Sequence, residues 1–316
     1  MCDCAGDVLN GYTTGPTVGE IMQILRHERG SVSRGDTYRI WFLADLHLGH
    51  CGCDKKLLKK TIDRIAATDP HTNRVFLLGD ILDAIAVTDK RFAMSSLDDD
   101  IRNSGRDDVI NQQINLAVDM LTPLKGRIDA LLIGNHEQMI VRKASSDPLE
   151  HIGRALEADY NGSICAYVRH VWPEKSKGGP GHGHGWRVDS QLHHGAGGGY
   201  LSGGKILRME RRAHSWPTAD LLASGHTHKR FVTTTSLMVA GEGNPVMIKE
   251  KTQHIFSVGS FLRGYHDKIK GVSYVEMADY APTDLGALYA DVEMQYTYDK
   301  RGKNCGRRPY IHWGNV

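Results

Sequence analysis

The stretch that decides the fold is Ile40-Trp41-Phe42-Leu43-Ala44, a continuously apolar run that leads directly into Asp45. The same pattern, a short apolar run that ends at a potential metal ligand, occurs at residues 75–79 before Asp80, at 130–134 before Asn135 and at 221–225 before His226. Short apolar runs without alternation are typical of strands that are buried on both faces. The four runs therefore predict four buried strands, each followed at once by a polar side chain.

Segments with helical periodicity lie between these runs. Apolar side chains recur at helical spacing in the segments 58–66, 110–121 and 149–156, and the second segment ends before Pro123. Alternating strands and helices predict an α/β fold whose sheet is parallel at its centre. In such sheets the ligand site lies beyond the carboxyl ends of the strands, which is where all four polar side chains fall. We therefore expect one shared site.

The N-terminal part of the chain has its own pattern. Residues 17–28 predict an amphipathic packing helix, because Thr17 and Glu20 fit a capping box and apolar side chains recur at helical spacing. We therefore expect an N-terminal extension with a helix over residues 1–36 and the main domain over 37–316.

The second half of the chain is less regular. Strand-like stretches near residues 230–235, 254–258, 272–276 and 287–294 predict a second, more antiparallel sheet. Two glycine-rich segments, 178–185 and 195–204, predict mobile loops on either side of His194.

Composition limits the class of protein. The 316 residues carry a formal net charge of +2 and 40% hydrophobic side chains, which is typical of a soluble globular protein. The chain lacks the basic excess that would by itself indicate nucleic-acid binding. No apolar run approaches the roughly 20 residues needed to cross a bilayer, and the N-terminus, with Asp3 and Asp7, does not resemble a signal peptide. We therefore expect a cytoplasmic protein without a membrane partner.

The six cysteines are expected to be free thiols, since a chain of this length needs no disulfide framework. One alternative stays open. Cys2 with Cys4 and Cys51 with Cys53 could supply a structural zinc site, although their spacing is tighter than that of the usual zinc knuckle.

Five polar clusters follow one another along the chain. They are Asp45-Leu46-His47, Gly79-Asp80 with Asp83, Gly134-Asn135-His136-Glu137, His194-Gly195 and Gly225-His226-Thr227-His228. Any one of them alone is also ordinary turn or helix-cap chemistry, but together and in this order they resemble the calcineurin-like metallophosphoesterase family. The resemblance runs from about Trp41 to His228, with an extension to Gly259-Ser260. It implies a four-layer αββα sandwich with a mixed, centrally parallel sheet and a second, more antiparallel sheet.

The residue types in these clusters indicate which metals they suit. Carboxylate and imidazole ligands together favour manganese, iron, zinc or nickel over magnesium and calcium. The resemblance implies two divalent ions, with manganese as the first expectation: Asp45, His47 and His228 for one ion, Asn135, His194 and His226 for the other, and Asp80 between them. Two ions about 3.5–4 Å apart activate a bridging hydroxide for attack on phosphorus. His193 is the neighbouring alternative to His194, which we favour because the family's ligand directly precedes a glycine.

Two further residues receive roles from the resemblance. His136 follows the candidate ligand Asn135 and is expected to point at the scissile phosphate, where it could protonate the leaving oxygen or stabilise negative charge. Asp83 is expected to hydrogen-bond His136 and fix its tautomer. Three other histidines, His50, His182 and His184, are expected to lie in loops, with contact to substrate or an extra metal as the alternative.

Departures from the family pattern bear on the substrate. The protein phosphatases of the family carry arginines at the positions of Ala84 and Ile133, which clamp a phosphomonoester dianion; the clamp is missing here, although Glu137 completes their Gly-Asn-His-Glu string. The string Asp45-Leu-His-Leu-Gly49 instead resembles the exonuclease subunits of double-strand-break repair complexes and the pyrophosphatases that act on UDP-linked lipid sugars. These departures favour a phosphodiesterase over a phosphatase.

A basic cluster lies between two of the candidate ligands. It comprises Lys205, Arg208, Arg211 and Arg212, and Arg230 and Arg263 lie close to other motif blocks. Arg208, Arg211, Arg212 and Arg263 are candidate contacts to a polyanion, whereas the alternative is a solvated helix face. We therefore predict a phosphodiesterase that acts on nucleic acid or a nucleotide. The alternatives are a phosphomonoesterase on protein or small molecules, a nucleotide pyrophosphatase and, least favoured, a scaffold without activity.

Overall fold

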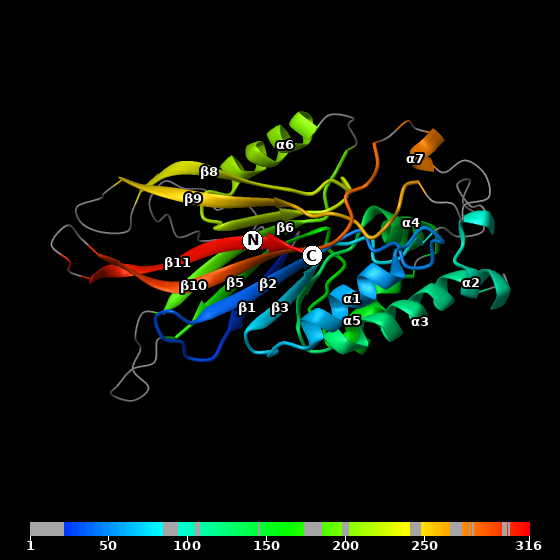
Figure 1. Cartoon of the computed structure of the whole chain (residues 1–316), viewed down its shortest axis with the longest axis horizontal. Helices are drawn as coiled ribbons and strands as arrows, with labels where there is room; N and C mark the ends of the chain where they lie inside the picture. The colour runs from blue at the N-terminus through cyan, green and yellow to red at the C-terminus, as the bar shows by residue number, and fades with distance from the viewer. Residues whose placement is uncertain are drawn as a thin grey trace, which may run out of the picture.

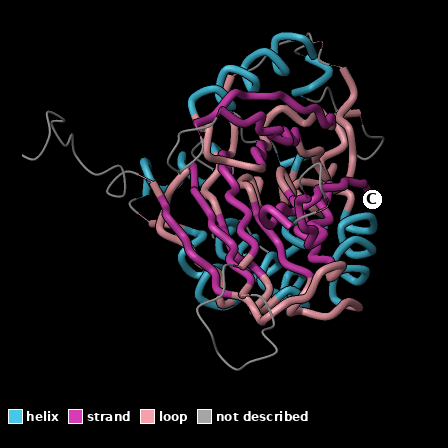
Figure 2. The backbone as a smooth tube through the Cα atoms, turned by 90° about the vertical axis from the view of Figure 1, so that its left-hand side faces the viewer, coloured by secondary structure: helices cyan, strands magenta, loops and turns pink. Residues whose placement is uncertain are grey.

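The computed structural model describes residues 22–84, 94–104, 108–144, 146–173, 185–197, 202–240, 248–265, 274–277, 279, 281–298, 302 and 304–316. Within these residues two β-sheets pack face to face, and helices cover the outer face of each sheet (Figures 1 and 2). The predicted αββα sandwich is therefore confirmed.

The first sheet has five strands in the order β11-β10-β2-β3-β4. They are β2 (Thr37–Leu43), β3 (Asn73–Leu77), β4 (Ile128–Leu131), β10 (Leu288–Tyr298) and β11 (Asn304–Asn315). The strands β2, β3 and β4 run parallel, whereas β10 is antiparallel to both β2 and β11. The apolar runs before Asp45, Asp80 and Asn135 are thus confirmed as parallel neighbours, and their carboxyl ends share one edge of the sheet.

The second sheet has six strands in the order β1-β5-β6-β7-β9-β8. They are β1 (Gln23–Glu28), β5 (Cys165–Trp172), β6 (Trp186–His193), β7 (Leu221–Ser224), β8 (Phe231–Ala240) and β9 (Ile248–Ser257). The strand β7 runs parallel to both β6 and β9, while β5 pairs with β6, and β8 with β9, in antiparallel fashion. The fourth apolar run, β7, therefore belongs to a different sheet from the other three.

The strands predicted in the second half of the chain are divided between the two sheets. The stretches near 230–235 and 254–258 form β8 and β9 and join β7, whereas 287–294 forms β10 and joins β2. The expected second sheet therefore exists and contains the stretches near 230–235 and 254–258, but the assignment of 287–294 to it is wrong. Both sheets are mixed, and each contributes strands whose carboxyl ends reach the candidate site.

Helices cover both outer faces of the sandwich. The first sheet is covered by α1 (Lys55–Ala66), α3 (Val109–Leu121) and α5 (Pro148–Leu156), which confirms the three predicted helices, and the second by α6 (Ser202–Ser215). The remaining helical segments are α2 (Asp99–Ser104), α4 (Asn135–Ala144), α7 (Tyr274–Met277) and the 3-10 turns Met94–Ser96 and Thr122–Leu124. No helix in the described part of the chain is long and apolar enough to cross a lipid bilayer.

Burial on both faces explains the apolar runs. In β2, Trp41 and Leu43 pack against the helices over the first sheet, while Phe42 points the other way and packs between the sheets. In β7, Leu222 packs under α6 and Leu221 packs between the sheets. Because both faces of each strand are covered, the sequence shows no polar alternation.

Two predicted elements are wrong where they can be compared. Residues 23–28 form the strand β1 instead of a helix, because they pair in parallel with β5 and their burial alternates with a period of two. The preceding residues 17–21 lie outside the described residues. The domain boundary predicted near residue 36 stays a prediction. Residues 274–276 belong to the helix α7, not a strand. Of the glycine-rich segments, residues 178–184 and 198–201 lie outside the described residues, whereas residues 202–204, predicted to be loop, begin the helix α6.

Candidate metal centre

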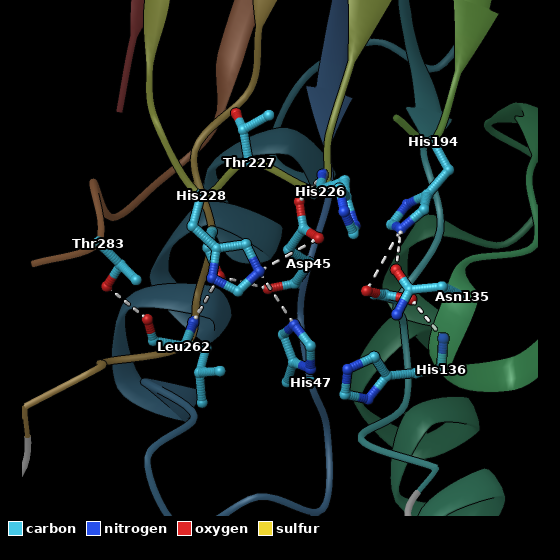
Figure 3. A network of polar contacts seen from close by, with 12 residues as sticks. Asp45, His47, Asn135, His136, His194, His226, Thr227, His228, Leu262 and Thr283 are labelled. Carbon is cyan, nitrogen blue, oxygen red and sulfur yellow. Dashed lines mark hydrogen bonds and ion pairs between the residues drawn. The ribbon is translucent and has the colours of Figure 1, made fainter. Parts of the chain in front are cut away.

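The loops that follow β2, β3, β6 and β7, together with the first turn of α4, meet at the carboxyl ends of the two sheets (Figure 3). Three groups of side chains there have ligand atoms that lie within 4.8 Å of one another: Asp45 with His47 and His228, Asp80 with His194 and His226, and His47 with Asp83 and His136. Six of the seven predicted ligands therefore converge in the first two groups. The seventh, Asn135, contacts the second group, because its Oδ1 lies 3.0 Å from Nε2 of His194.

The backbone at five of the candidate ligands is left-handed. The φ angles are 52° at Asp45, 48° at His47, 49° at Asp80, 67° at His226 and 50° at His228. Non-glycine residues in this region cost about 1–3 kcal/mol each, and such conformations persist where the surrounding structure enforces them. The strain therefore concentrates where these side chains converge, as is common at functional sites.

Asp45 is held through its backbone and one carboxylate oxygen. Its carbonyl accepts hydrogen bonds from Ser260 Oγ (2.8 Å) and the Phe261 amide (3.0 Å), and its Oδ2 accepts one from the His226 amide (2.7 Å). Its Oδ1 has no hydrogen-bond partner among the described residues, although the side chain is fully buried. This oxygen lies 3.4 Å from Nε2 of His228. A buried carboxylate oxygen beside an imidazole nitrogen fits a cation, since an unpaired charge is costly to bury.

His47 faces His228 across the first group. Their Nε2 atoms lie 3.3 Å apart, and the His47 Nδ1 lies 3.6 Å from Oδ1 of Asp83. Burial lowers the pKa of His47 to about 4, although Asp83 acts against this. A neutral imidazole is the form that binds metals, so the ring is ready to act as a ligand.

His194 lies at the centre of the second group. Its Nδ1 contacts the carbonyl of Leu78 at 2.7 Å, which directs Nε2 toward Oδ2 of Asp80 at 3.3 Å. Burial raises the pKa of Asp80 and lowers that of His194, but the attraction between the two side chains outweighs it: the pKa of Asp80 is lowered well below its usual value and that of His194 is raised. The neighbouring His193 instead accepts a hydrogen bond from the Gly195 amide at 2.7 Å. His194, and not His193, is therefore the member of the group.

His136 lies in the first turn of α4 beside the first two groups. Its backbone amide donates to Oδ1 of Asp80 (3.0 Å), and its ring packs edge-on against that of His47 (Figure 3). Its Nδ1 lies 2.5 Å from the main-chain carbonyl of Asp83, whereas the Asp83 carboxylate is 3.9 Å away. The expected contact between the two residues exists, but the backbone carbonyl makes it. Burial lowers the pKa of His136, but Asp80 and Asp83 outweigh it and raise the pKa.

Glu137 has a structural role in the site that our reading of the sequence missed. Its fully buried carboxylate accepts hydrogen bonds from the amides of Gly134 (2.9 Å), Asp80 (3.2 Å) and Leu82 (2.8 Å). Burial raises its pKa to about 7, and Asp80 adds to this effect. The sequence does carry a signal, because a glutamate three residues after the residue that precedes a helix is half of a capping box. The bonds to Asp80 and Leu82 tie the two ligand-bearing loops together.

The four candidate substrate-binding arginines have different surroundings. Arg208 and Arg212 on α6 donate to main-chain carbonyls, and Arg263 forms an ion pair with Asp54. Arg211 is exposed and makes no hydrogen bond or ion pair with another described side chain. Only Arg211 therefore presents a guanidinium without a described partner.

Cys51, Cys53 and Cys165 are free thiols. Burial raises the pKa of Cys53 to about 12, which keeps it a thiol, whereas zinc binds the thiolate. This favours the free-thiol interpretation. Cys2 and Cys4 lie outside the described residues.

Comparison with known proteins identifies the family. Residues 38–230, more than half of the chain and all seven candidate ligands, match the family model described as calcineurin-like phosphoesterase. No curated protein sequence matches the chain.

Three solved structures are similar in fold, all with TM-scores below 0.5. A conserved uncharacterised protein from Streptococcus pneumoniae TIGR4, described as a predicted phosphoesterase, has 11% identity, covers 88% of this chain and 99% of its own, and gives a TM-score of 0.31. A protein of unknown function from Aquifex aeolicus has 16% identity over 61% of this chain and 80% of its own, with a TM-score of 0.31. GAP50, the anchor in the inner membrane complex of Plasmodium, has 10% identity over 86% and 88%, with a TM-score of 0.40. On the match over residues 38–230, the chain belongs to the calcineurin-like phosphoesterase family and is a metal-dependent phosphoesterase.

Proposed function

We propose that this enzyme is a dinuclear-metal phosphodiesterase that hydrolyses phosphodiester bonds in nucleic acid or a nucleotide, with a nuclease favoured and manganese as the metal. In this proposal Asp45, His47 and His228 would hold one ion, Asn135, His194 and His226 would hold the other, and Asp80 would serve both. Two groups of converging carboxylate and imidazole donors support the assignment, as does the buried Oδ1 of Asp45 without a hydrogen-bond partner among the described residues. The donor chemistry suits manganese, iron, zinc or nickel.

The chain's own residues supply orientation and a proton. When bound, two divalent ions supply Lewis acidity at the phosphoryl oxygens and activate water. His136 is held by its contact with the Asp83 carbonyl, so its Nε2 is free to donate a proton to the leaving oxygen. Glu137 keeps the loop of Asp80 and the first turn of α4 in register, because one carboxylate accepts from both.

The choice of a diester rests on one observation, the environment of positions 84 and 133. Ala84 and Ile133 are each 2% exposed, and the Ala84 amide donates to Oε1 of Gln113 at 2.8 Å. Neither side chain can contact a phosphate oxygen as the arginine clamp of the family's phosphatases does. A dianionic monoester therefore loses binding energy here, whereas a diester carries one charge per phosphate and can be held through its flanking groups.

The exposed guanidinium of Arg211 supports a polyanionic substrate. It lies on α6, the helix between the loops of His194 and His226, and is free to pair with a backbone phosphate. Arg208, Arg212 and Arg263 remain predicted contacts, although each already donates to another group.

Two chromogenic esters test the proposal directly. With manganese present, bis-p-nitrophenyl phosphate should be cleaved with a higher kcat/KM than p-nitrophenyl phosphate. Single-stranded and duplex DNA, RNA and a nucleotide pyrophosphate are then compared at several salt concentrations, because released counterions make cleavage of a polyanion salt-dependent. A preference for the monoester would contradict the diester assignment. Good cleavage of the pyrophosphate without nuclease activity would contradict the nucleic-acid assignment.

A further inference from the structure

We propose that α6 is a positioning helix for the metal centre, and that Lys205, Arg208 and Arg212 hold the loops that carry His194, His226 and His228. This inference rests on the proposed function, since it concerns the residues assigned there as ligands. It gives three members of the basic cluster a role in placing metal ligands. The guanidinium of Arg211, the fourth member, makes no hydrogen bond or ion pair with another described side chain.

The helical phase of these residues sets the direction in which they point. Lys205, Arg208 and Arg212 lie at positions i, i+3 and i+7, in phase with the apolar residues Met209 and Ala213. Met209 and Ala213 are buried on the second sheet, against residues that include Leu222 and Ile255. Lys205 and Arg212 are therefore partly buried on the side of the helix that faces the protein, whereas Arg208 lies at its exposed edge. Figure 1 shows α6 lying over the second sheet.

Lys205 contacts the loop that carries two ligands. Its Nζ donates to the carbonyl of Thr227 at 3.1 Å, and Thr227 lies between His226 and His228 (Figure 3). Both neighbours have left-handed backbones. The Thr227 amide in turn donates to the Gly225 carbonyl at 2.8 Å. The charged amino group of Lys205, which donates to the Thr227 carbonyl, therefore supports the middle of a turn whose backbone is strained.

Arg208 contacts the loop that follows His194. Its Nη1 donates to the carbonyls of Ala196 and, at 3.2 Å, of Gly197. Gly197 has a φ of 71°, and a Cβ atom at this residue would lie 2.5 Å from the same Nη1. The glycine therefore allows the guanidinium to approach the loop closely.

Arg212 contacts β7, the strand that precedes His226. Its half-buried guanidinium donates from Nη2 to the carbonyl of Ala223 at 3.2 Å. Burial lowers its pKa to about 10. The structure thus accommodates a partly desolvated cation at this position, where it contacts the strand that leads into the ligand loop.

The two ligand loops also touch each other. A Cβ atom on Gly195 would lie 2.6 Å from Cβ of His226 and 2.7 Å from the Gly225 carbonyl, so the loops meet with no room for a side chain. Because α6 donates to both loops, it fixes His194 relative to His226 and His228. Some groups hydrogen-bond metal ligands without binding the metal themselves. When such a group is removed, metal affinity typically falls by about 10–100-fold.

The test is a manganese titration of the metal-free full-length protein, followed by the electron paramagnetic resonance signal of free Mn²⁺. We expect wild type to bind two ions, and Lys205→Met and Arg208→Met to bind at least one of them about tenfold more weakly. Lys205→Arg should keep the affinity within about threefold of the wild-type value, because arginine can also donate to the Thr227 carbonyl. Arg211→Met, on the same helix but out of phase with these residues, should leave metal affinity unchanged.

Backbone hydrogen exchange gives a second readout. In metal-free Lys205→Met, the amides of residues 226–228 should exchange about tenfold faster than in wild type, and those in Arg211→Met should not. If wild type binds two ions and both Lys205→Met and Arg208→Met bind them with wild-type affinity, the positioning role is overturned while the proposed function stands. If wild type binds no manganese, the proposed function fails, and the positioning role falls with it.

Discussion

Replacing Asp129 by asparagine should destabilise the protein without affecting its metal centre. Asp129 is 1% exposed, and its carboxylate accepts hydrogen bonds from Arg74 (Nε at 2.8 Å), from Arg29 and from His170 (2.9 Å). An asparagine keeps one acceptor oxygen and no charge, so two arginines in a largely buried setting lose their counter-ion. Breaking a buried pair in this way costs about 3–5 kcal/mol. Because the arginine side chains retain 13% and 15% exposure, we expect about 3 kcal/mol.

The assay is urea unfolding at pH 7, in which the midpoint shift multiplied by the m-value gives the change in the free energy of unfolding. Asp63→Asn is the matched control, since it removes an exposed pair with Lys59 worth about 0.5 kcal/mol or less. Metal affinity should stay at the wild-type value in both variants, because Asp129 lies at the start of β4 and Asn135 beyond its other end.

The stability difference between wild type and Asp129→Asn should also depend on pH. Burial raises the pKa of Asp129, but His170 and Arg74 outweigh it and hold the pKa far below its usual range. A carboxylate with a lowered pKa contributes stability above its unfolded pKa of about 3.9, and this contribution is lost as the pH falls further. The difference between wild type and Asp129→Asn should therefore shrink from pH 5 toward pH 2. A loss below about 1 kcal/mol at pH 7, or a difference that does not change with pH, would refute this reasoning.

Four further predictions concern the metal centre. Asp80→Asn should lower bound manganese at both positions in elemental analysis and more than His47→Ala does, because a bridging carboxylate neutralises both ions; equal losses would contradict the bridge. His136→Ala should keep its metal but lose about 100-fold or more in kcat on a diester with a poor leaving group, and an unchanged kcat would remove its role as proton donor. Glu137→Ala should weaken manganese binding about tenfold or more in calorimetry, whereas wild-type affinity would show that its three hydrogen bonds do not position ligands. Chelation should abolish hydrolysis and added manganese restore it; activity that survives complete metal removal would exclude a metal mechanism.

Much of the site could be predicted because its local signals are strong. The runs before Asp45, Asp80, Asn135 and His226 lack polar alternation, since their strands are covered on both faces. Burial on both faces can therefore be predicted from the residues of each strand alone. The assignment of β7 to the second sheet was not predicted, because strand pairing depends on hydrogen bonds to β6 and β9, which are distant in sequence. The helix predicted over residues 17–28 is wrong at residues 23–28 for the same reason, because pairing with β5 decides the conformation of this segment.

The sequence by itself determined which side chains follow the buried strands and therefore which donor atoms the site contains. Only the tertiary structure decided how they meet. The His226 amide donates to a carboxylate 181 residues away in the chain, on Asp45, and Glu137 accepts from an amide 57 residues away, on Asp80. The basic cluster on α6 illustrates the same division: its composition indicated a polyanion, but its helical phase on the second sheet turned Lys205 toward the ligand loop. Burial period and turn chemistry are local properties of a chain, whereas the direction and partner of a polar side chain depend on contacts that exist only once distant segments have packed together.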